Sequence, residues 1–466
     1  MLGRRILGLF IASCCLCNSI PQGRAQGVGD TAVASAPTPR IKATTQPLYD
    51  YVSAPDASYD WEVRERLTIQ DCDVLRVHLV SQTWHDIAWR HVVYLIKPPN
   101  LDPQRRDAVL VVAGGSWDQA WPENGPQSVS LRGEAQLMAG VAQQFGCIIA
   151  VASQIPFQPM MEGKHEDEII ATTFKNYIES GDATWPLLLP MVKAAMRSMD
   201  AATAAAQREW QVNLENFTVT GASKRGWTTW LTGAMDSRVT AIAPMVIDML
   251  RMDRQMQHQI DSWGKYSEQI ADYTELQLPK MLGTPEGQSL QGIVDPFAYR
   301  GQLGQPKLLI FGTNDRYWPL DACNLYWDQL EGDKYLLYVP NQGHGIRDYA
   351  RLIGSLSALH HSLHGGPALP KLTWDHQQAD NQSELVVATK DSIDSVHGWV
   401  ASSDSKDFRD ATWSQQACQR IDEESWKLTV AAPEKGYRAF FAEAVFLSND
   451  LPGFLSTNMT IVGGNP

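Results

Sequence analysis

The stretch Asn216–Trp230, NFTVTGASKRGWTTW, decides the fold of this chain. Its first part, FTVT (217–220), is rich in β-branched residues and predicts a strand. Gly221 and Ser223 follow in a short turn, and the segment after Lys224 is able to continue as a helix. A strand, a tight turn with serine at its apex and a helix together present a serine nucleophile at the edge of a sheet. We therefore predict Ser223 as the nucleophile of a hydrolase.

The turn departs from the common G-x-S-x-G elbow. Gly221 stands two residues before the serine, but Arg225 occupies the place of the second glycine and Gly226 comes one residue late. The alternative interpretation is an ordinary strand-to-helix turn with an incidental serine. Because short motifs need structural context, the surrounding sequence has to decide between the two.

Length and composition fit a globular protein with a sizeable core: 466 residues, 44% hydrophobic and 20% charged. The formal net charge is −13. Phosphate binding needs a basic surface, so this charge argues against nucleic acid as the main partner. We expect a small-molecule or peptide substrate instead.

The first 25 residues have the features of a secretory signal peptide. Arg4 and Arg5 form a positive segment, residues 6–16 are an apolar run, and the GRA at 23–25 places small residues where a signal peptidase cleaves. The run is too short to span a membrane as a helix. We expect a periplasmic or secreted protein with no transmembrane span.

A second interpretation of the N-terminus stays open. IASC at 11–14 resembles a lipobox, which would leave a lipid anchor on Cys14, although the apolar run before it would be unusually short. Residues 26–48 are predicted to form a flexible leader, because they are rich in Ala, Thr, Pro and Gly.

Four cysteines remain once the three in the predicted signal peptide are set aside: Cys72, Cys147, Cys323 and Cys418. In an exported chain they could form two disulfides, and their pairing stays open. Cys147 lies in an apparent buried strand, where an inert core thiol is expected. No C-x-x-C pair is among the four, so neither a zinc nor a redox site is indicated, and we predict no metal and no cofactor.

Strands and helices alternate through the middle of the chain. Residues 61–97 alternate in the manner of antiparallel strands, and VLVV (109–112) is typical of a central parallel strand. Helical and strand-like segments then follow in turn at 134–146, 147–153, 166–210, 216–223, 239–247, 306–315, 334–345 and 348–365. This order predicts a mostly parallel, doubly wound sheet of the α/β-hydrolase type over residues 49–366.

Two regions fall outside that alternation. Residues 249–300 are helical and rich in Met, Gln and aromatic residues, and they stand where such folds insert a cap over the active site. Residues 367–466 contain short strand-like segments at close spacing, which predict a C-terminal β-sandwich-like domain.

Two strand ends supply partners for Ser223. Asp315 ends the strand LLIFGTND, and His344, between two glycines, follows the next strand in YVPNQGHG. The chain order Ser, Asp, His is the order of the α/β-hydrolase triad. We predict that Asp315 orients His344 and that His344 takes the proton of Ser223. Asp248, after the strand at 239–247, and Asp295 are the rival acids.

Further residues are candidates for the same site. The backbone N–H groups of Lys224 and of the loop Gly115, Ser116 and Trp117 are predicted to form the oxyanion hole. A plain glycine turn is the alternative for that loop. The side chains of Lys224 and Arg225 are expected to be a solvated cationic pair.

Aromatic and histidine residues elsewhere have open interpretations. Tyr317 and Trp318 follow Asp315 and are candidates for substrate binding or, alternatively, for packing. His360 and His364 share a helix face, but the region contains no H-E-x-x-H, and we expect a cluster on the helix surface.

Three long stretches resemble the PhoPQ-activated pathogenicity-related protein family: DYVSAPDASYDWEV, GASKRGWTTWLTGAMDSRVTAIAPMVIDML, and GTNDRYWP with YVPNQGHG. The resemblance covers nearly the whole mature chain and includes the G-A-S-K-R-G form of the elbow. It implies a secreted or periplasmic α/β-hydrolase with its nucleophile, acid and base at Ser223, Asp315 and His344. It also implies a link to virulence and to resistance against antimicrobial peptides, but it implies no substrate.

The sequence therefore predicts an exported serine hydrolase that acts on an ester or a peptide through an acyl-enzyme. The alternative hypothesis is a non-catalytic secreted binding or signalling protein on a hydrolase scaffold, since a fold does not fix a function.

Overall fold

The computed structural model describes residues 44–118, 120–122, 134–379 and 381–463. The predicted signal peptide, the candidate anchor at Cys14 and most of the predicted leader lie outside these residues. Helix α1 (Gln46–Ser53) already begins within the segment predicted as leader, and it buries Leu48 and Val52.

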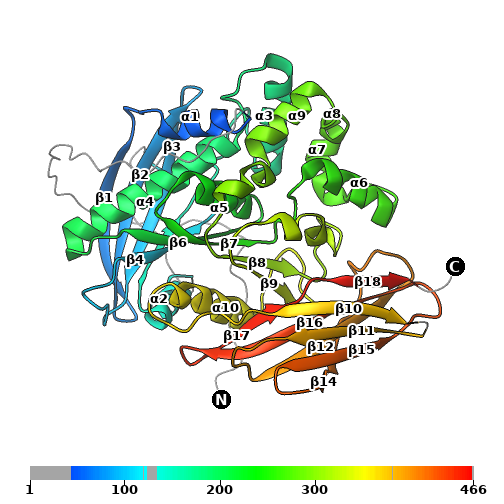
Figure 1. The fold of residues 1–466 in the computed structure, drawn as a ribbon. Helices are drawn as coiled ribbons and strands as arrows, with labels where there is room; N and C mark the ends of the chain where they lie inside the picture. Colours follow the sequence, from blue (N-terminus) through cyan, green and yellow to red (C-terminus); the bar gives the residue numbers. More distant parts are fainter. Residues whose placement is uncertain (1–43, 119, 123–133, 380, 464–466) are drawn as a thin grey trace.

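One sheet of 14 strands runs through the described part of the molecule (Figure 1). Its first nine strands lie in the order β1-β2-β3-β5-β4-β6-β7-β8-β9. They are β1 (Asp60–Ile69), β2 (Cys72–Trp84), β3 (Ile87–Lys97), β4 (Asp107–Val112), β5 (Ile148–Ala152), β6 (Asn216–Ala222), β7 (Val239–Met245), β8 (Lys307–Gly312) and β9 (Lys334–Val339). β1 to β3 form an antiparallel meander, and the strands from β5 to β9 in that order pair in parallel.

The central strands are apolar because helices cover both faces of the sheet. All six residues of β8 are buried, and β6 is buried over 217–221. With a parallel centre, an antiparallel start and a serine turn after β6, the chain has the α/β-hydrolase fold that the sequence predicted. Parallel strands also bring their carboxyl ends to one edge, where ligands of such sheets bind.

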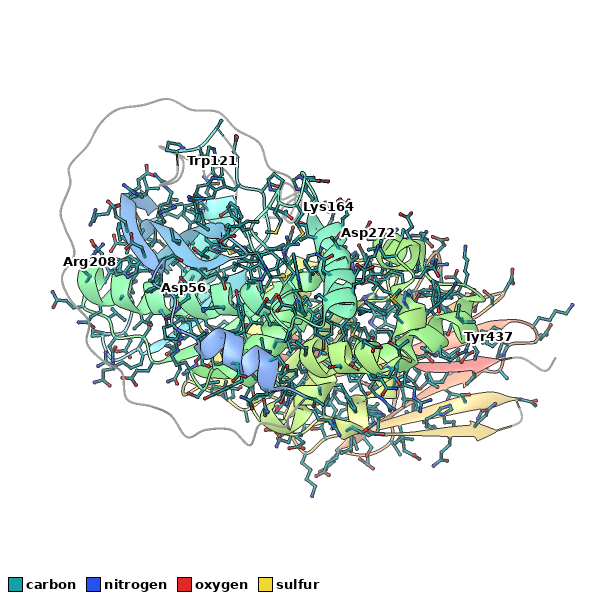
Figure 2. The ribbon with its side chains drawn as sticks, turned by 90° about the horizontal axis from the view of Figure 1, so that it is seen from above. Asp56, Trp121, Lys164, Arg208, Asp272 and Tyr437 are labelled. Carbon is teal, nitrogen blue, oxygen red and sulfur yellow. The ribbon has the colours of Figure 1, made fainter. Side chains whose placement is uncertain are left out.

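Helices α4 (Leu188–Trp210) and α5 (Lys224–Met235) cover one face of the sheet, and α2 (Glu134–Phe145) and α10 (Tyr349–Ser362) cover the other (Figure 1). Seen from above, α1 lies against α4 (Figure 2). None of the helices in the described ranges combines the length and the apolar character that a membrane crossing needs.

The long helix predicted over 166–210 is two helices in the structure. α3 (Glu166–Ser180) ends at Gly181, which adopts a left-handed conformation with φ of 73°, and α4 begins only at Leu188. Glycine closes a helix in this conformation without steric cost, and Pro186 lies in the connection between the two helices. The helical pattern is periodic on both sides of this connection, so periodicity alone does not predict the break.

The region predicted as a cap, 249–300, is helical. Its elements are α6 (Met252–Trp263), η1 (Glu268–Ile270), α7 (Ala271–Glu275), α8 (Leu278–Met281), α9 (Pro285–Val294) and η2 (Pro296–Gln302). α7, α8 and α9 pack against α3, and Figure 1 shows this group of helices together on one side of the sheet.

The C-terminal part is β-rich, but it does not stand apart from the hydrolase sheet. Its strands are β10 (Thr373–Ala379), β11 (Gln382–Ala388), β12 (Ser395–Ser403), β13 (Ser414–Ala417), β14 (Gln419–Arg420), β15 (Ser425–Ala431), β16 (Tyr437–Ser448), β17 (Leu451–Ser456) and β18 (Thr460–Gly463). β17 pairs with β9 through Ser456 and Leu336, so β12, β13, β16, β17 and β18 extend the main sheet. β10, β11, β14 and β15 form a second sheet, and an apolar cluster with Leu428 and Phe440 packs where the two sheets meet.

The four cysteines in the described part of the chain are free thiols. Cys72, Cys147 and Cys323 are buried, and Cys418 is partly buried. Cys147 packs in the apolar cluster of Val109, Phe145 and Ile149, as expected of a core thiol. The structure therefore contains neither of the two disulfides that the sequence left open.

Candidate active site

Ser223 lies at the apex of a strained turn between β6 and α5. Its backbone has φ of 58° and ψ of −128°, a conformation that residues other than glycine rarely adopt. The Ser223 N–H donates to the carbonyl of Met245 on β7 (2.8 Å), which fixes the turn. Strain of about 1–3 kcal/mol persists only where the surrounding structure imposes it, and it concentrates at functional sites.

The glycines around the elbow are required by close approaches. A Cβ on Gly226 would lie 2.7 Å from Ile247 Cγ2 and 2.9 Å from the Met245 carbonyl oxygen. A Cβ on Gly221 would lie 2.8 Å from the carbonyl oxygen of Arg225. Gly226, one position later than in the common motif, is thus the glycine that lets α5 begin against β7.

Asp315 and His344 form a hydrogen-bonded pair at the ends of neighbouring strands. The two carboxylate oxygens of Asp315 lie 3.1 and 2.9 Å from Nδ1 of His344. The N–H of Tyr317 also donates to Asp315 (2.9 Å), and the Tyr317 ring stacks on the imidazole at 4.1 Å. Because a carboxylate only accepts, the hydrogen lies on Nδ1 and Nε2 is left as an acceptor.

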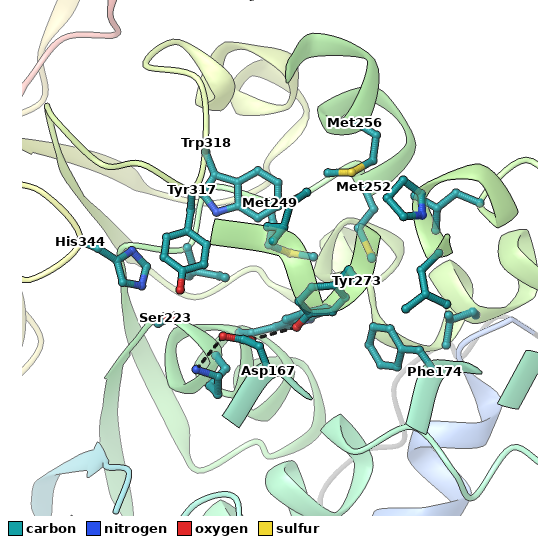
Figure 3. Close-up of a pocket in the computed structure, with 18 of the residues that line it drawn as sticks. Asp167, Phe174, Ser223, Met249, Met252, Met256, Tyr273, Tyr317, Trp318 and His344 are labelled. Carbon is teal, nitrogen blue, oxygen red and sulfur yellow. Dashed lines mark hydrogen bonds and ion pairs between the residues drawn. The ribbon is translucent and has the colours of Figure 1, made fainter. Parts of the chain in front are cut away.

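One pocket brings the serine and the histidine together (Figure 3). Its open space, including the part open to solvent, is about 780 Å³, and both Ser223 and His344 line it. His344 Nε2 is buried and has no hydrogen-bond partner in the described part of the chain. Trp318 also lines the pocket, and its Nε1 is buried and has no hydrogen-bond partner among the described residues.

The two rival acids are held elsewhere. Asp248 is buried and accepts a hydrogen bond from the Tyr326 hydroxyl (2.6 Å), and burial raises its pKa well above the ordinary value. Asp295 accepts from the N–H groups of Met252 and Phe297, both at 2.9 Å, and burial raises its pKa to about 7. Both carboxyls are thus occupied in capping or core contacts, whereas Asp315 bonds His344.

The candidate oxyanion donors divide into two groups. Lys224 lines the pocket directly after Ser223. In the loop after β4, the Trp117 N–H donates to the Gln158 carbonyl (2.7 Å), so the inclusion of Trp117 among the donors was wrong. Within the described ranges, the N–H groups of Gly115 and Ser116 have no such acceptor. That loop is not part of the pocket wall.

The sequence model of a known protein family, described as PhoPQ-activated pathogenicity-related protein, matches residues 48–409. The chain belongs to this family. The matched residues include the elbow, Asp315, His344 and the helical region 249–300. Autocrine proliferation repressor protein A of Dictyostelium discoideum is 30% identical over 435 residues, which cover 86% of each chain.

Two solved structures that are similar to this chain have lower sequence identity. Acetyl xylan esterase 1 from a Thermoanaerobacterium species is 13% identical with a TM-score of 0.44, covering 67% of this chain and 91% of that one. Glucuronoyl esterase from Solibacter usitatus is 13% identical with a TM-score of 0.39, covering 68% and 91%. The fold of the PhoPQ-related chain therefore rests on its own strand order rather than on these weak likenesses.

A partly buried ion cluster braces the elbow of this chain, and the sequence did not predict it. Glu166 binds Arg225 through two hydrogen bonds of 2.7 and 2.8 Å and lies 2.8 Å from Lys224 Nζ. Asp167 lies 3.1 Å from the same Nζ. Burial alone would raise the pKa of Glu166, but Arg225 and Lys224 outweigh it and hold that pKa well below its usual range. The expected solvated cationic pair was wrong.

The same cluster ties the elbow to the loops beside it. Arg225 Nε donates to the Ile155 carbonyl (2.6 Å), and Gln158 Nε2 donates to Glu166 (2.6 Å). A Cβ on Gly114 would lie 2.5 Å from an Arg225 nitrogen, so glycine there makes room for the guanidinium. The only sequence sign of this cluster is the neighbouring acidic pair at 166–167, which by itself is the ordinary start of a helix.

His360 and His364 of this PhoPQ-related chain do not form the expected surface cluster. His360 is fully buried, with Nε2 2.8 Å from Asp107 and Nδ1 2.9 Å from the Thr218 hydroxyl. Asp107, Cys147 and His360 have ligand atoms close enough to hold a metal ion. However, Arg105 already pairs with Asp107 at 2.9 Å and neutralises it, so the cluster fits a structural network.

Proposed function

We propose that this protein is a serine hydrolase that works through an acyl-enzyme. The observation that carries the proposal is the hydrogen-bonded pair of Asp315 and His344. His344 lines the same pocket as Ser223, whose backbone is strained, and its Nε2 has no hydrogen-bond partner among the described residues. A serine alcohol needs such a base, oriented by a third group, to become a nucleophile.

In the proposed reaction, Ser223 Oγ attacks the substrate carbonyl carbon while His344 Nε2 takes its proton. Asp315 holds the imidazole through Nδ1 and stabilises the imidazolium that forms. The negative oxygen of the tetrahedral intermediate is held by the backbone N–H of Lys224, the residue directly after Ser223. His344 then gives the proton to the leaving group, and a water activated by the same base releases the acyl group from Ser223.

Hydrolysis of p-nitrophenyl esters, followed from the first turnover into the steady state, tests this proposal. We expect a burst of p-nitrophenol equal to the enzyme concentration if deacylation is slower than acylation. Ser223→Ala and His344→Ala should each lower kcat by a factor on the order of 10⁶, and the double variant should lose little more, because the residues act as a unit. Wild-type rates no higher than those of folded Ser223→Ala would contradict the proposal.

We also propose that the protein acts outside the cytoplasm, in the periplasm or after secretion. The support is the signal-like sequence of residues 1–25. The family's name suggests a role in virulence, with resistance to antimicrobial peptides as a hypothesis. Fractionation of cells that produce the full chain tests the location: recovery of intact, uncleaved protein in the cytoplasm would contradict it.

The name of the Dictyostelium relative, an autocrine proliferation repressor, favours a second candidate function. This is a non-catalytic secreted binding or signalling protein that keeps the hydrolase scaffold. The two candidates differ in one result: a Ser223→Ala protein that retains full biological activity would favour the signalling role, and loss of that activity would favour catalysis.

A further inference from the structure

The pocket beside Ser223 is polar at one end and apolar over the rest of its wall (Figure 3). The polar end is formed by Ser223, Lys224, Asp167 and His344. The remaining wall is dominated by carbon-rich side chains from several elements: Phe174 and Ile178 of α3, Trp227 of α5, Leu282, and Leu290 of α9. Binding sites of this kind hold an apolar group by burial and fix its orientation through the few polar atoms.

The charges at the polar end compensate one another. Asp167 is paired with Lys224 Nζ (3.1 Å) and accepts a hydrogen bond from the Tyr273 hydroxyl (3.0 Å). Glu166, beside it, is paired with Arg225 and Lys224. Two carboxylates thus face two cations, so none of these four groups offers a charged substrate a charge that lacks a counter-charge. A neutral substrate is favoured, because burying an unpaired charge is costly.

The cap side of the pocket is lined by methionines. Met249, Met252 and Met256 lie on it, the last two on α6 (Figure 3). Methionine is flexible and adapts its shape to what it contacts. Such a wall suits a chain with many conformations better than a rigid ring. The wall also reaches Trp227, four residues after Ser223, which is about 6 Å along the axis of α5.

We propose that this pocket binds the acyl chain of a neutral ester, and that the substrate class is esters of apolar carboxylic acids longer than acetate. The proposal rests on the serine hydrolase function proposed above. A peptide is less suited to the pocket, since its backbone groups would each need a hydrogen-bond partner, and the polar atoms of the wall gather near Ser223.

A series of p-nitrophenyl esters tests the substrate class. Burying one methylene stabilises by about 0.8 kcal/mol, so each can raise kcat/KM by up to about fourfold. We expect the octanoate to exceed the acetate by more than about tenfold. A flat profile, or acetate as the best substrate, would overturn the acyl-chain proposal while leaving the hydrolase proposal intact. Hydrolysis of none of the esters would overturn both.

Matched variants on α6 locate the chain. Met256 lines the pocket, whereas the next residue, Gln257, is exposed and bonds Asp261. We expect Met256→Trp to lower kcat/KM for the octanoate by about tenfold or more while the acetate value stays within about twofold. Gln257→Trp should leave both unchanged. Equal losses on both esters, or no loss with Met256→Trp, would overturn the proposal.

A second pair of variants keeps the test valid if Met256→Trp does not fold. Ile178 of α3 lines the same pocket, and its neighbour Glu179 is exposed. Ile178→Trp should show the same selective loss, and Glu179→Trp should not. Cleavage of a hydrophobic aminoacyl p-nitroanilide faster than the octanoate ester would overturn the ester class in favour of a peptidase.

Discussion

The bracing of the elbow by Glu166 gives a quantitative prediction for Glu166→Gln. Breaking a buried pair by removing one partner costs about 3–5 kcal/mol, because a charge is left uncompensated. Glu166 keeps 39% of its side chain exposed, whereas Arg225 keeps 12% and Lys224 8%. Solvent therefore screens part of the loss. Lys224 also retains Asp167, so we expect a cost of about 2 kcal/mol.

Urea unfolding followed by tryptophan fluorescence measures that cost. For a chain of this size, about 2 kcal/mol also corresponds to a fall of roughly 2–3 °C in Tm. We expect kcat/KM to fall by about tenfold or more, since displacement of a catalytic group by about 1 Å can cost about 100-fold. Urea unfolding measures what Glu166 contributes to the stability of the whole fold, and kcat/KM measures whether the elbow still holds Ser223 in position.

The contribution of Glu166 to the stability of the fold depends on pH. The pKa of Glu166 is lowered in the folded state, so its contribution is fully present above about pH 4.5 and is lost as the pH falls toward the folded-state pKa. The stability difference between wild type and Glu166→Gln should therefore be full at pH 7 and shrink below about pH 4.5.

Glu168→Gln is the matched control for Glu166→Gln. Glu168 lies on the same helix and pairs with Lys164, but it is exposed, and such pairs contribute about 0.3–0.5 kcal/mol. If Glu166→Gln cost no more stability than Glu168→Gln and left kcat/KM unchanged, the bracing role would be refuted.

Three other predictions follow from single contacts. Gly226→Ala should cost about 1–3 kcal/mol in urea unfolding, because its Cβ would lie 2.7 Å from Ile247 Cγ2; an unchanged midpoint would contradict this. Asp248→Asn should leave kcat within about threefold, since Asp248 bonds Tyr326 and not His344, whereas Asp315→Asn should lower kcat by about 10⁴; similar losses in ester hydrolysis would argue against Asp315 as the orienting acid. Burial lowers the pKa of His91 to about 4, so about 3 kcal/mol of stability should be lost as the pH falls from about 6.5 to 4; a His91→Gln variant with the same pH profile would refute the assignment.

The sequence predicted those parts of the site that depend on local pattern and chain order. Ser223, Asp315 and His344 each follow a strand, and the carboxyl ends of parallel strands meet at one edge. The sequence alone therefore predicts that these three residues lie near one another. The helical character of 249–300 could be predicted for a similar reason, because it follows from composition and from the interruption of the alternation.

Contacts between distant segments could not be predicted in this way. Glu166 meets Arg225 across 59 positions, and two solvated charges have the same local pattern as a buried pair. The sequence predicts a surface position for His360, because its partner Asp107 lies 253 positions away in the chain. The joining of β17 to β9 likewise depends on a pairing between strands far apart in the chain.

Covalent labelling of the full chain tests the central claim most directly. Purified wild type and Ser223→Ala are treated with a fluorophosphonate, and the modified peptide is mapped by mass spectrometry. We expect one adduct, on Ser223 of the wild type, and no adduct on the variant. Folded wild type that gains no adduct, or an adduct that persists in Ser223→Ala, would contradict it.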